Sequence, residues 1–283
     1  MQYGFKPALF EFAVLDTTEA EFDGLTLHEL WTKHRSEVFG DGLPDKERFP
    51  LLVKILDARQ RMSIQVHPPA DIAAEMGGEP KTEMWYIAEA DPEAALYVGL
   101  KSGVSREDFE RGAAEGTTES QVHRIQSNAG DFMFIPSGRL HAIGGGQVIY
   151  EIQENSDTTY RVFDWNRVGL DGSPRQLHVD ESLRCIDFDD VEPEMDQPDG
   201  ETLVDCPLFR VERWEIGSGD AREAAGGGSF AILSVVAGEV RCGGRPFAKG
   251  DFFVVPASAD ADTSQLESVS ATATVLVTTL PSG

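Results

Sequence analysis

A glutamine and a histidine lie two residues apart in the stretch SIQVHPP, which spans residues 63–69. Successive side chains of a strand point to opposite faces, so Gln65 and His67 share one face while Ile64 and Val66 share the other. The two prolines that follow would end such a strand, because proline cannot donate a backbone hydrogen bond. An amide and an imidazole on one face of an apolar strand indicate either a hydrogen-bonded polar pair of the core or two ligands of a common group.

Two further stretches carry side chains that can bind a metal. The segment KTEMWYI places Lys81, Glu83 and Trp85 on one face of a predicted strand. The segment GDFMFIPSGRLHAI, residues 130–143, predicts a strand, a tight turn and an inward-facing histidine, and it resembles the second motif of the cupin barrels. The candidate ligands are therefore Gln65, His67, Glu83 and His141. An amide oxygen, two imidazoles and a carboxylate suit Zn²⁺ with an open coordination position, although two imidazoles also fit other divalent metals.

Short β-type segments bounded by Gly, Pro, Asp or Asn follow one another from residue 49 onward, which is typical of an all-β barrel or sandwich. Before them, residues 9–15 are a candidate strand and residues 25–40 resemble a helix. A helical insertion is predicted at about 105–115, with Ser105 as its N-cap and two acidic residues in its first turn.

An internal repeat relates the two halves of the chain. The segments AGDFMFIPSGRLHAI and KGDFFVVPASADADT share a Gly-Asp pair, an apolar strand and a proline at the same offset, but the second has Ala259 or Asp260 near the place of His141. We therefore predict a mainly β protein with two cupin-like β-barrel or jelly-roll domains and a few helices in the N-terminal part and the connector. The expected parts are a catalytic metal-binding domain at 1–165 with a helical insertion at about 102–120, a connector at 166–206, and a C-terminal domain without metal ligands at 207–283.

The composition narrows the class of protein. Forty-nine acidic residues against 24 basic ones give a net charge of −25, which repels nucleic acid and anionic membranes. No apolar run reaches the roughly 18 residues of a membrane span, and the N-terminus does not resemble a secretion signal. Three widely spaced cysteines indicate free thiols, so we expect a cytoplasmic protein without nucleic-acid or membrane partners.

Five segments in order resemble the type I phosphomannose isomerases in their short bacterial form: FPLLVKILDA, SIQVHP, KTEMWY, GDFMFIPSGRLHAIGGG and YEIQENSDTTYRVFDW. The resemblance runs from about Phe49 to Trp165 and, more loosely, into the second β domain. It implies that the four candidate ligands hold one Zn²⁺ or another divalent metal per chain, that Arg161 is the active-site arginine, and that Glu151 and Asp157 occupy acidic positions of the family motif.

The resemblance also implies the interconversion of mannose 6-phosphate and fructose 6-phosphate through a cis-enediol. Such a reaction needs a cation near the two reacting oxygens, a base for the migrating proton and positive charge for the phosphate. Lys54, Lys81 and Arg161 lie beside the ligand motifs of a strongly acidic protein, which fits an anionic sugar phosphate. We expect Lys54 and Asp157 to bind the substrate and Arg161 and Lys81 to take part in catalysis.

Each basic residue also has a purely structural interpretation. Lys54 and Lys81 could lie at exposed strand ends, and Arg161 could pair with Asp157 or Asp164.

The base is the least defined role. Glu151 shares a face with Ile149 and Gln153, and a carboxylate on an apolar strand costs free energy unless it is paired, so Glu151 is the first candidate. A structural ion pair of Glu151 with Arg161, or a base supplied by Lys81 or by a hydroxide on the metal, stays open.

Two alternatives come from other functional classes, a metal-dependent cupin oxygenase and a non-catalytic sugar-phosphate-binding cupin. The first has no use for three basic side chains together, and the second would tolerate the loss of ligands that this chain has kept.

The sequence departs from the family at Pro69-Ala70, where an acidic pair is usual, and in lacking an aromatic-Gly-Gly stretch near the N-terminus. A monomer or a homodimer is expected.

Overall fold

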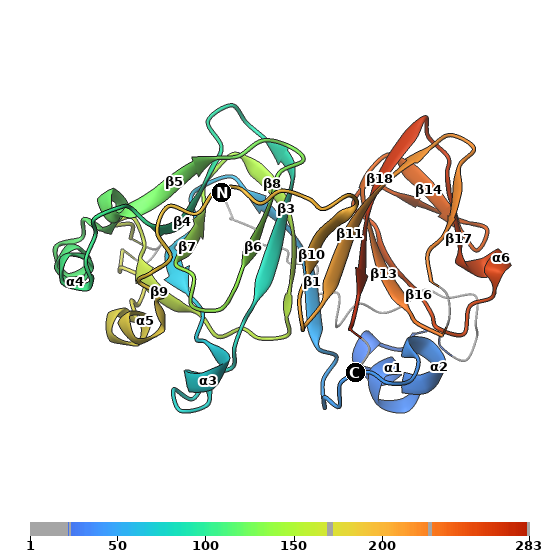
Figure 1. Ribbon diagram of the computed structural model, residues 1–283, viewed down its shortest axis with the longest axis horizontal. Helices are drawn as coiled ribbons and strands as arrows, with labels where there is room; N and C mark the ends of the chain where they lie inside the picture. Colours follow the sequence, from blue (N-terminus) through green and yellow to red (C-terminus); the bar gives the residue numbers. More distant parts are fainter. Residues whose placement is uncertain (1–21, 23, 169–171, 226–227, 282–283) are drawn as a thin grey trace. The chain divides into compact units, whose positions relative to one another are not determined.

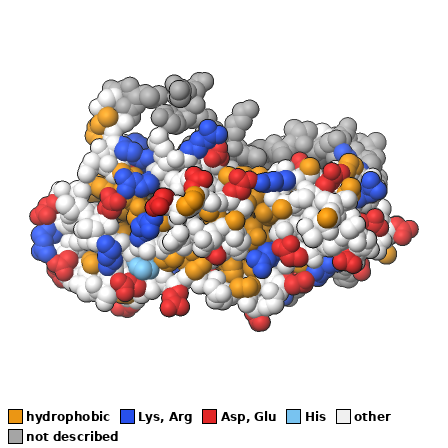
Figure 2. All heavy atoms as spheres, turned by 90° about the horizontal axis from the view of Figure 1, so that it is seen from above, with side chains coloured by type: hydrophobic (Ala, Val, Ile, Leu, Met, Phe, Trp, Pro, Cys, Tyr) orange, Lys and Arg blue, Asp and Glu red, His pale blue; other side chains and the backbone are white. Residues whose placement is uncertain are grey.

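The computed structural model describes residues 22, 24–168, 172–225 and 228–281, so the candidate strand at 9–15 lies outside the described residues. The described residues form two compact units, one of residues 54–196 and the other of residues 24–53 and 197–281 (Figure 1). Each unit consists mainly of antiparallel strands in two sheets, which confirms the predicted mainly β, jelly-roll type of fold. Figure 2 shows acidic side chains scattered over the visible face and not gathered into one patch.

The first unit contains a four-stranded sheet of order β1-β8-β3-β6 and a five-stranded sheet of order β5-β4-β7-β2-β9. The four-stranded sheet consists of β1 (Leu51–Ala58, of which Lys54 onward belongs to this unit), β3 (Glu83–Ala90), β6 (Phe132–Ile135) and β8 (Gln147–Glu154). The five-stranded sheet consists of β2 (Ile64–Val66), β4 (Ala95–Leu100), β5 (Val122–Gln126), β7 (His141–Ile143) and β9 (Tyr160–Phe163). Buried side chains from both sheets, such as Ile87 and Ile149 of the first and Leu96 and Ile143 of the second, form one apolar cluster. Burial of each such side chain contributes about 1.5–3 kcal/mol.

Short helices connect the strands of the first unit, namely α3 (Ala70–Ala73), α4 (Arg106–Glu115), η2 (Thr118–Gln121) and α5 (Val179–Cys185). Helix α4 confirms the predicted helical segment and its cap. Ser105 Oγ accepts the backbone N–H of Asp108 at 3.1 Å, while the Asp108 carboxylate accepts that of Ser105 at 3.3 Å. This reciprocal pair satisfies two amide groups that the first turn leaves without partners.

The second unit contains a five-stranded sheet of order β10-β11-β18-β13-β16 and a four-stranded sheet of order β12-β17-β14-β15. Their strands are β10 (Thr202–Asp205), β11 (Arg210–Gly217), β12 (Ala221–Glu223), β13 (Ala231–Ala237), β14 (Glu239–Cys242), β15 (Arg245–Ala248), β16 (Phe252–Val255), β17 (Gln265–Ser268) and β18 (Thr272–Thr279). Its helices are α1 (Leu27–Lys33), α2 (Arg35–Phe39) and α6 (Ala261–Ser264).

Helices α1 and α2 confirm the helical character predicted for residues 25–40. Both helices belong to the second unit, together with the C-terminal strands. Within it, the ring of Phe39 lies 5.3 Å from that of Phe49 and 5.0 Å from that of Phe230. The domain boundaries predicted from the sequence, at 165 and 206, stay a prediction.

The internal repeat is confirmed as a shared architecture. The order β1-β8-β3-β6 of the first unit matches β11-β18-β13-β16 of the second, and β5-β4-β7-β2 matches β15-β14-β17-β12. The turns before β6 and β16 are alike, since Gly130 and Gly250 both have φ of 94°, a conformation that favours glycine. In each turn an aspartate, Asp131 or Asp251, accepts a backbone N–H three residues earlier at 2.7 Å.

Among the described residues no helix is both long and apolar enough to cross a membrane. All three cysteines are free thiols, with Cys185 and Cys242 buried and Cys206 partly exposed. Burial raises the pKa of the Cys185 and Cys242 thiols to about 11.

Candidate metal centre

Two histidines and a glutamate meet inside the first unit. His67 follows β2, Glu83 begins β3 and His141 begins β7, and their donor atoms all lie within 4.8 Å of one another. Each Glu83 oxygen faces one imidazole, with 3.6 Å from Oε2 to Nε2 of His67 and 3.6 Å from Oε1 to Nε2 of His141. The three side chains are at most 1 % exposed. The sequence-predicted histidines and glutamate are thus brought together.

Backbone carbonyls hold both imidazole rings in one orientation. Nδ1 of His67 lies 2.8 Å from the carbonyl oxygen of Thr158, and Nδ1 of His141 lies 2.8 Å from that of Arg139. Because a carbonyl can only accept, each Nδ1 carries the hydrogen, and each Nε2 keeps a lone pair that faces Glu83. This arrangement is usual for histidines that bind a metal.

Burial keeps the imidazoles neutral. It lowers the pKa of His141 to about 3, and the charge of Glu83 opposes this effect only in part. Burial and the charge of Lys81 likewise lower the pKa of His67, again against the effect of Glu83. Neutral imidazole is the form that binds metal ions.

Glu83 is the most unusual group of the centre. It is fully buried, and within the described part of the chain neither oxygen accepts a hydrogen bond of acceptable geometry, although Lys81 Nζ lies 2.6 Å from Oε2. Burial alone would raise its pKa, but the charge of Lys81, with smaller contributions from the two imidazoles, outweighs that effect and holds the pKa well below its usual value. A buried, ionised carboxylate between two imidazole lone pairs, with one ammonium beside it, is a set of groups that fits a divalent cation.

Gln65 lies beside these donors through strand pairing. It is opposite His141 on β7 and opposite Arg161 on β9, so the three side chains form a row across the sheet. The amide Nε2 is 3.3 Å from Nε2 of His141, whereas Oε1 is 3.4 Å from the hydroxyl of Ser63. The amide nitrogen, and not the oxygen, therefore faces the imidazole.

A chain of alternating charges continues from Glu83. Lys81 Nζ lies 3.4 Å from His67 Nε2 and 4.0 Å from Glu151 Oε1, and Lys54 Nζ lies 2.8 Å from the same Glu151 oxygen. Two ammonium groups and two carboxylates thus neutralise one another inside the first unit. Burial would lower the pKa of Lys81, but Glu83 and Glu151, with a smaller contribution from Asp157, raise it further, so this ammonium stays protonated.

The partners of Glu151 are Lys54 and Trp85. The Trp85 indole N–H donates to Oε2 of Glu151 at 3.0 Å, and Lys54 also contacts Oε1 of Gln153. The structural ion pair of Glu151 with Arg161 that the sequence left open is not formed, since none of the described ion pairs involves Arg161.

Arg161 contacts polar groups that carry no charge. Its Nε donates to Ser63 Oγ at 3.1 Å, and its Nη1 donates to the carbonyl of Gln176 at 3.0 Å. The other partner considered for it, Asp164, instead contacts Arg167 and, at 3.7 Å, Arg175. Burial and the charge of Arg175 lower the pKa of Arg161. Asp157, which the sequence also offered as a partner of Arg161, is exposed in the segment before β9.

Several polar groups of this centre were missed by reasoning from the sequence. Alternation placed Trp85 on the face of Glu83 and Gln153 on that of Glu151, but their contacts with Glu151 and Lys54 were not predicted. Ser63, which contacts both Gln65 and Arg161, and the carbonyl of Thr158 had no signal, because their roles depend on contacts between distant segments.

Comparisons with known proteins agree with this geometry. Residues 13–105 match the family described as phosphomannose isomerase type I, catalytic domain. The mannose-6-phosphate isomerase ManA of Bacillus subtilis is 37 % identical over 250 residues, which cover 83 % of this chain and 77 % of that protein. A crystal structure of the mannose 6-phosphate isomerase from Bacillus subtilis superimposes with a TM-score of 0.78 at 33 % identity, over 93 % of this chain and 84 % of that one.

A more distant structure shares the fold. A mannose 6-phosphate isomerase bound with zinc and yttrium superimposes with a TM-score of 0.66 at 16 % identity, over 92 % of this chain and 87 % of that one.

Proposed function

Since this chain belongs to the type I phosphomannose isomerases, and is an isomerase of mannose 6-phosphate, we propose that its reaction takes place at the centre of His67, Glu83 and His141. The observation that carries this proposal is the buried Glu83 carboxylate, whose two oxygens each face the Nε2 atom of one neutral imidazole at 3.6 Å. The product of the reaction is fructose 6-phosphate.

The centre holds one Zn²⁺ per chain. His67, Glu83 and His141 supply three ligands, and Gln65 supplies a fourth when its amide turns so that Oε1 replaces Nε2 beside His141. The nitrogen and oxygen donors suit zinc, and a zinc-bound mannose 6-phosphate isomerase has the same fold. When bound, the ion stabilises negative charge on the reacting oxygens of the sugar, which is worth several kcal/mol.

The migrating proton requires a group that can accept it and return it. Glu151 is the candidate, because its carboxylate is oriented by Lys54 and Trp85 and lies within 4.0 Å of the Lys81 ammonium. Lys81 is unsuited to accept a proton, since its carboxylate neighbours raise its pKa. It acts instead as a positive charge beside the developing enediolate.

The phosphate requires positive charge that is not already neutralised. Lys54 and Lys81 face two carboxylates, whereas within the described part of the chain the Arg161 side chain donates to a hydroxyl and a carbonyl. Arg161 is therefore the side chain best able to bind or orient the anionic substrate, and its planar guanidinium suits a phosphate or an oxyanion. Lys54 and the exposed Asp157 contact the remaining polar groups of the sugar phosphate.

A coupled assay with mannose 6-phosphate tests the centre. We expect turnover to disappear after chelation and to return on addition of Zn²⁺, with one zinc per chain by elemental analysis. Glu151→Gln should lower kcat by about 10²–10⁴-fold at unchanged zinc content, because general acid–base catalysis contributes that much. Glu93→Gln, at an exposed position of the same unit, is the matched control. Zinc-loaded protein without isomerase activity would contradict the site, and a fully active Glu151→Gln would contradict the base.

The oxygenase and the non-catalytic cupin are not favoured. The interior beside the metal donors contains two ammonium groups and two carboxylates, where an oxygenase needs open apolar space, and all the candidate ligands are present. A cytoplasmic location and a monomeric or homodimeric state complete the proposal, and light scattering after gel filtration tests the latter.

A further inference from the structure

The pairing register relates each position of the metal centre to a position in the second unit. Glu83 on β3 lies opposite Ile135 on β6, and Ala231 on β13 lies opposite Val255 on β16. Ile135 and Val255 are matching residues of the internal repeat, 120 positions apart. Ala231 is therefore the counterpart of Glu83.

The same register defines the counterparts of the charged neighbours. Trp85 lies opposite Glu151, and the equivalent pair in the second unit is Leu233 and Val277. Lys81, two residues before Glu83, corresponds to Ser229. The second unit therefore lacks the buried carboxylates and the ammonium at these places.

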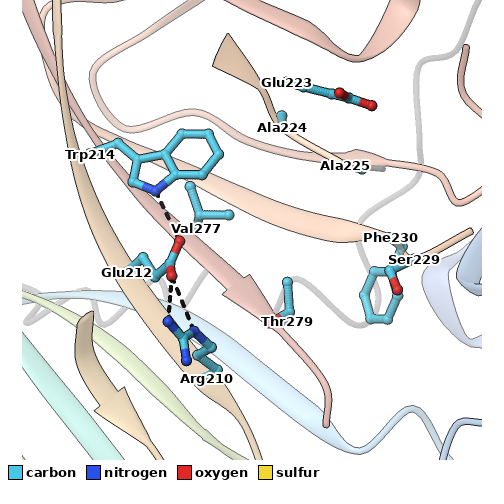
Figure 3. Close-up of a pocket in the computed structure, with 10 residues that line it drawn as sticks. All are labelled: Arg210, Glu212, Trp214, Glu223, Ala224, Ala225, Ser229, Phe230, Val277 and Thr279. Atoms are coloured by element: carbon cyan, nitrogen blue, oxygen red, sulfur yellow. Dashed lines mark hydrogen bonds and ion pairs between the residues drawn. The ribbon is translucent and has the colours of Figure 1, made fainter. Parts of the chain in front are cut away.

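A cavity of about 280 Å³ lies at this equivalent place. Its lining includes Arg210, Glu212, Trp214, Ser229, Val277 and Thr279 (Figure 3). Two of these residues, Ser229 and Val277, are the counterparts of Lys81 and Glu151. The second unit has thus kept an open space where the first unit places its charged groups.

The inward face of β11 changes from apolar to charged at this cavity. Positions 210, 212 and 214 share one face, and Glu212 lies opposite Val277 while Arg210 lies opposite Thr279. Trp214 and Val277 belong to the apolar core of the unit, so the charged pair begins where that core ends. Arg210 and Glu212 are partly exposed and pair with each other, so they form a polar rim at the edge of the apolar core.

The polar groups of the cavity form a fixed frame. The Glu212 carboxylate accepts a hydrogen bond from Arg210 at 2.7 Å on one oxygen and from the Trp214 indole N–H at 3.0 Å on the other (Figure 3). Arg210 also contacts Asp205, which lies outside the lining, at 2.6 Å, and the exposed Glu223 adds a second lining carboxylate. The Arg222 guanidinium lies 3.9 Å over the Trp214 ring and is itself paired with Glu201. The lining thus has one guanidinium and two carboxylates, and this net negative charge disfavours a phosphate or a sugar phosphate.

We propose that this cavity of the second unit binds an uncharged monosaccharide. The volume of about 280 Å³ suits one sugar ring, at the lower end of small-molecule sites. Val277 and the part of the Trp214 ring that Arg222 leaves uncovered offer apolar surface to the C–H groups of the ring. The carboxylate of Glu212 and the hydroxyls of Ser229 and Thr279 offer partners for its hydroxyl groups. The site is separate from the metal centre and takes a sugar without its phosphate.

Calorimetric titration of the zinc-loaded full-length protein with D-mannose tests this site. Ser229→Tyr introduces an aromatic ring from an exposed position of the lining, and Glu212→Gln removes the charge of a central acceptor at nearly constant shape. We expect each variant to weaken D-mannose binding at least tenfold while kcat and KM for mannose 6-phosphate stay unchanged, which also shows that the variants are folded. Glu267→Gln, an exposed position on β17 outside the cavity, should bind as the unmodified protein does.

Two further titrations separate this site from the catalytic one. Binding of D-mannose should persist in excess mannose 6-phosphate. Titration with inorganic phosphate should give the same heat for the unmodified protein and for Ser229→Tyr. The proposal is overturned if the active enzyme does not bind D-mannose, if Ser229→Tyr binds it equally well, or if mannose 6-phosphate displaces it. Phosphate binding that Ser229→Tyr abolishes would likewise overturn it, in favour of an anion site.

Discussion

The two units share a turn down to its hydrogen bonds but differ in the side chains that face their interiors. In both turns the glycine N–H donates across to the neighbouring strand, from Gly130 to the carbonyl of Ile87 at 2.8 Å and from Gly250 to that of Val235 at 2.9 Å. Opposite the far end of the strand that follows the first turn lies the buried Glu83, and at the equivalent place after the second lies Ala231. The Gly-Asp and proline of the repeat are thus requirements of the fold, whereas the chemistry depends on a few inward positions beside them.

The difference between the interiors also has an energetic side. The first unit buries Lys81, Glu83 and Glu151, which depend on one another for charge neutrality. The second unit has uncharged residues at the corresponding positions, namely the exposed Ser229 and the buried Ala231 and Val277. Groups that depend on one another are sensitive to the loss of any single member. The first unit should therefore respond more strongly than the second to substitution at matching positions.

Replacement of His141 should cause the largest loss of activity among the substitutions that test the difference between the two units. His141→Ala removes one of three donors, so zinc and turnover should be lost together, with activity falling by about 10³-fold or more because a metal contributes several kcal/mol. Elemental analysis and the coupled assay measure the two quantities. His123→Ala, on β5 outside the metal group, should change neither. Retention of zinc by His141→Ala would remove the proposed distinction between the units.

Replacement of Arg161 should separate turnover from metal binding. Arg161→Ala removes a guanidinium that contacts none of the three donors, so zinc content should stay the same while kcat falls by about 10²–10³-fold, the range for loss of one donor to a developing charge. Arg124→Ala, exposed on β5, is the matched control. Full activity of Arg161→Ala would show that the arginine has only a structural role.

Substitution at the matched pair Lys81 and Ser229 tests the energetic difference directly. Lys81→Met leaves the carboxylates of Glu83 and Glu151 without their shared cation, so the metal-free protein should lose about 3–5 kcal/mol of unfolding free energy. Ser229→Met, at an exposed position, should change it by less than about 0.5 kcal/mol. Urea unfolding in the presence of chelator measures both. Equal effects would mean that the buried charges are not interdependent.

The rate at which the buried thiols are alkylated compares how readily the two units open, because each unit contains one such thiol. Burial raises the pKa of both Cys185 and Cys242 to about 11, so little reactive thiolate is present at pH 8. Alkylation of the native protein should be about 10²-fold slower than in denaturant, and it should speed up about tenfold per pH unit up to pH 10. Peptide mass spectrometry follows each cysteine separately. Fast labelling of one alone would show that its unit opens more readily.

Much of the metal centre could be predicted from the sequence because its residues lie on short strands with clear alternation. Alternation placed Gln65 with His67 and Lys81 with Glu83, and the order of the motifs joined these pairs to His141. The mainly β fold, the capped helix after Ser105 and the internal repeat followed from equally local patterns.

The ion pairs could not be predicted, because they depend on which strands become neighbours. Lys54 and Glu151 are 97 residues apart, and nothing in their local sequence distinguishes this pair from one of Glu151 with Arg161. The association of Phe39 and Phe49 with Phe230 is of the same kind, since it links the ends of the chain through packing alone. The orientation of the Gln65 amide depends on Ser63, whose hydroxyl carries no pattern.

Because β2 is short, metal binding would also stabilise the pairing register of this strand. This strand has three residues, which pair with β9 at Ile64, Gln65 and Val66 and with β7 at Gln65 alone, so its alignment depends on short ladders. A slip by one residue would turn Ile64 and Val66 toward the donors and carry Gln65 and His67 to the other face. A metal ion held by these donors would bind the native alignment and would therefore stabilise it over the slipped one.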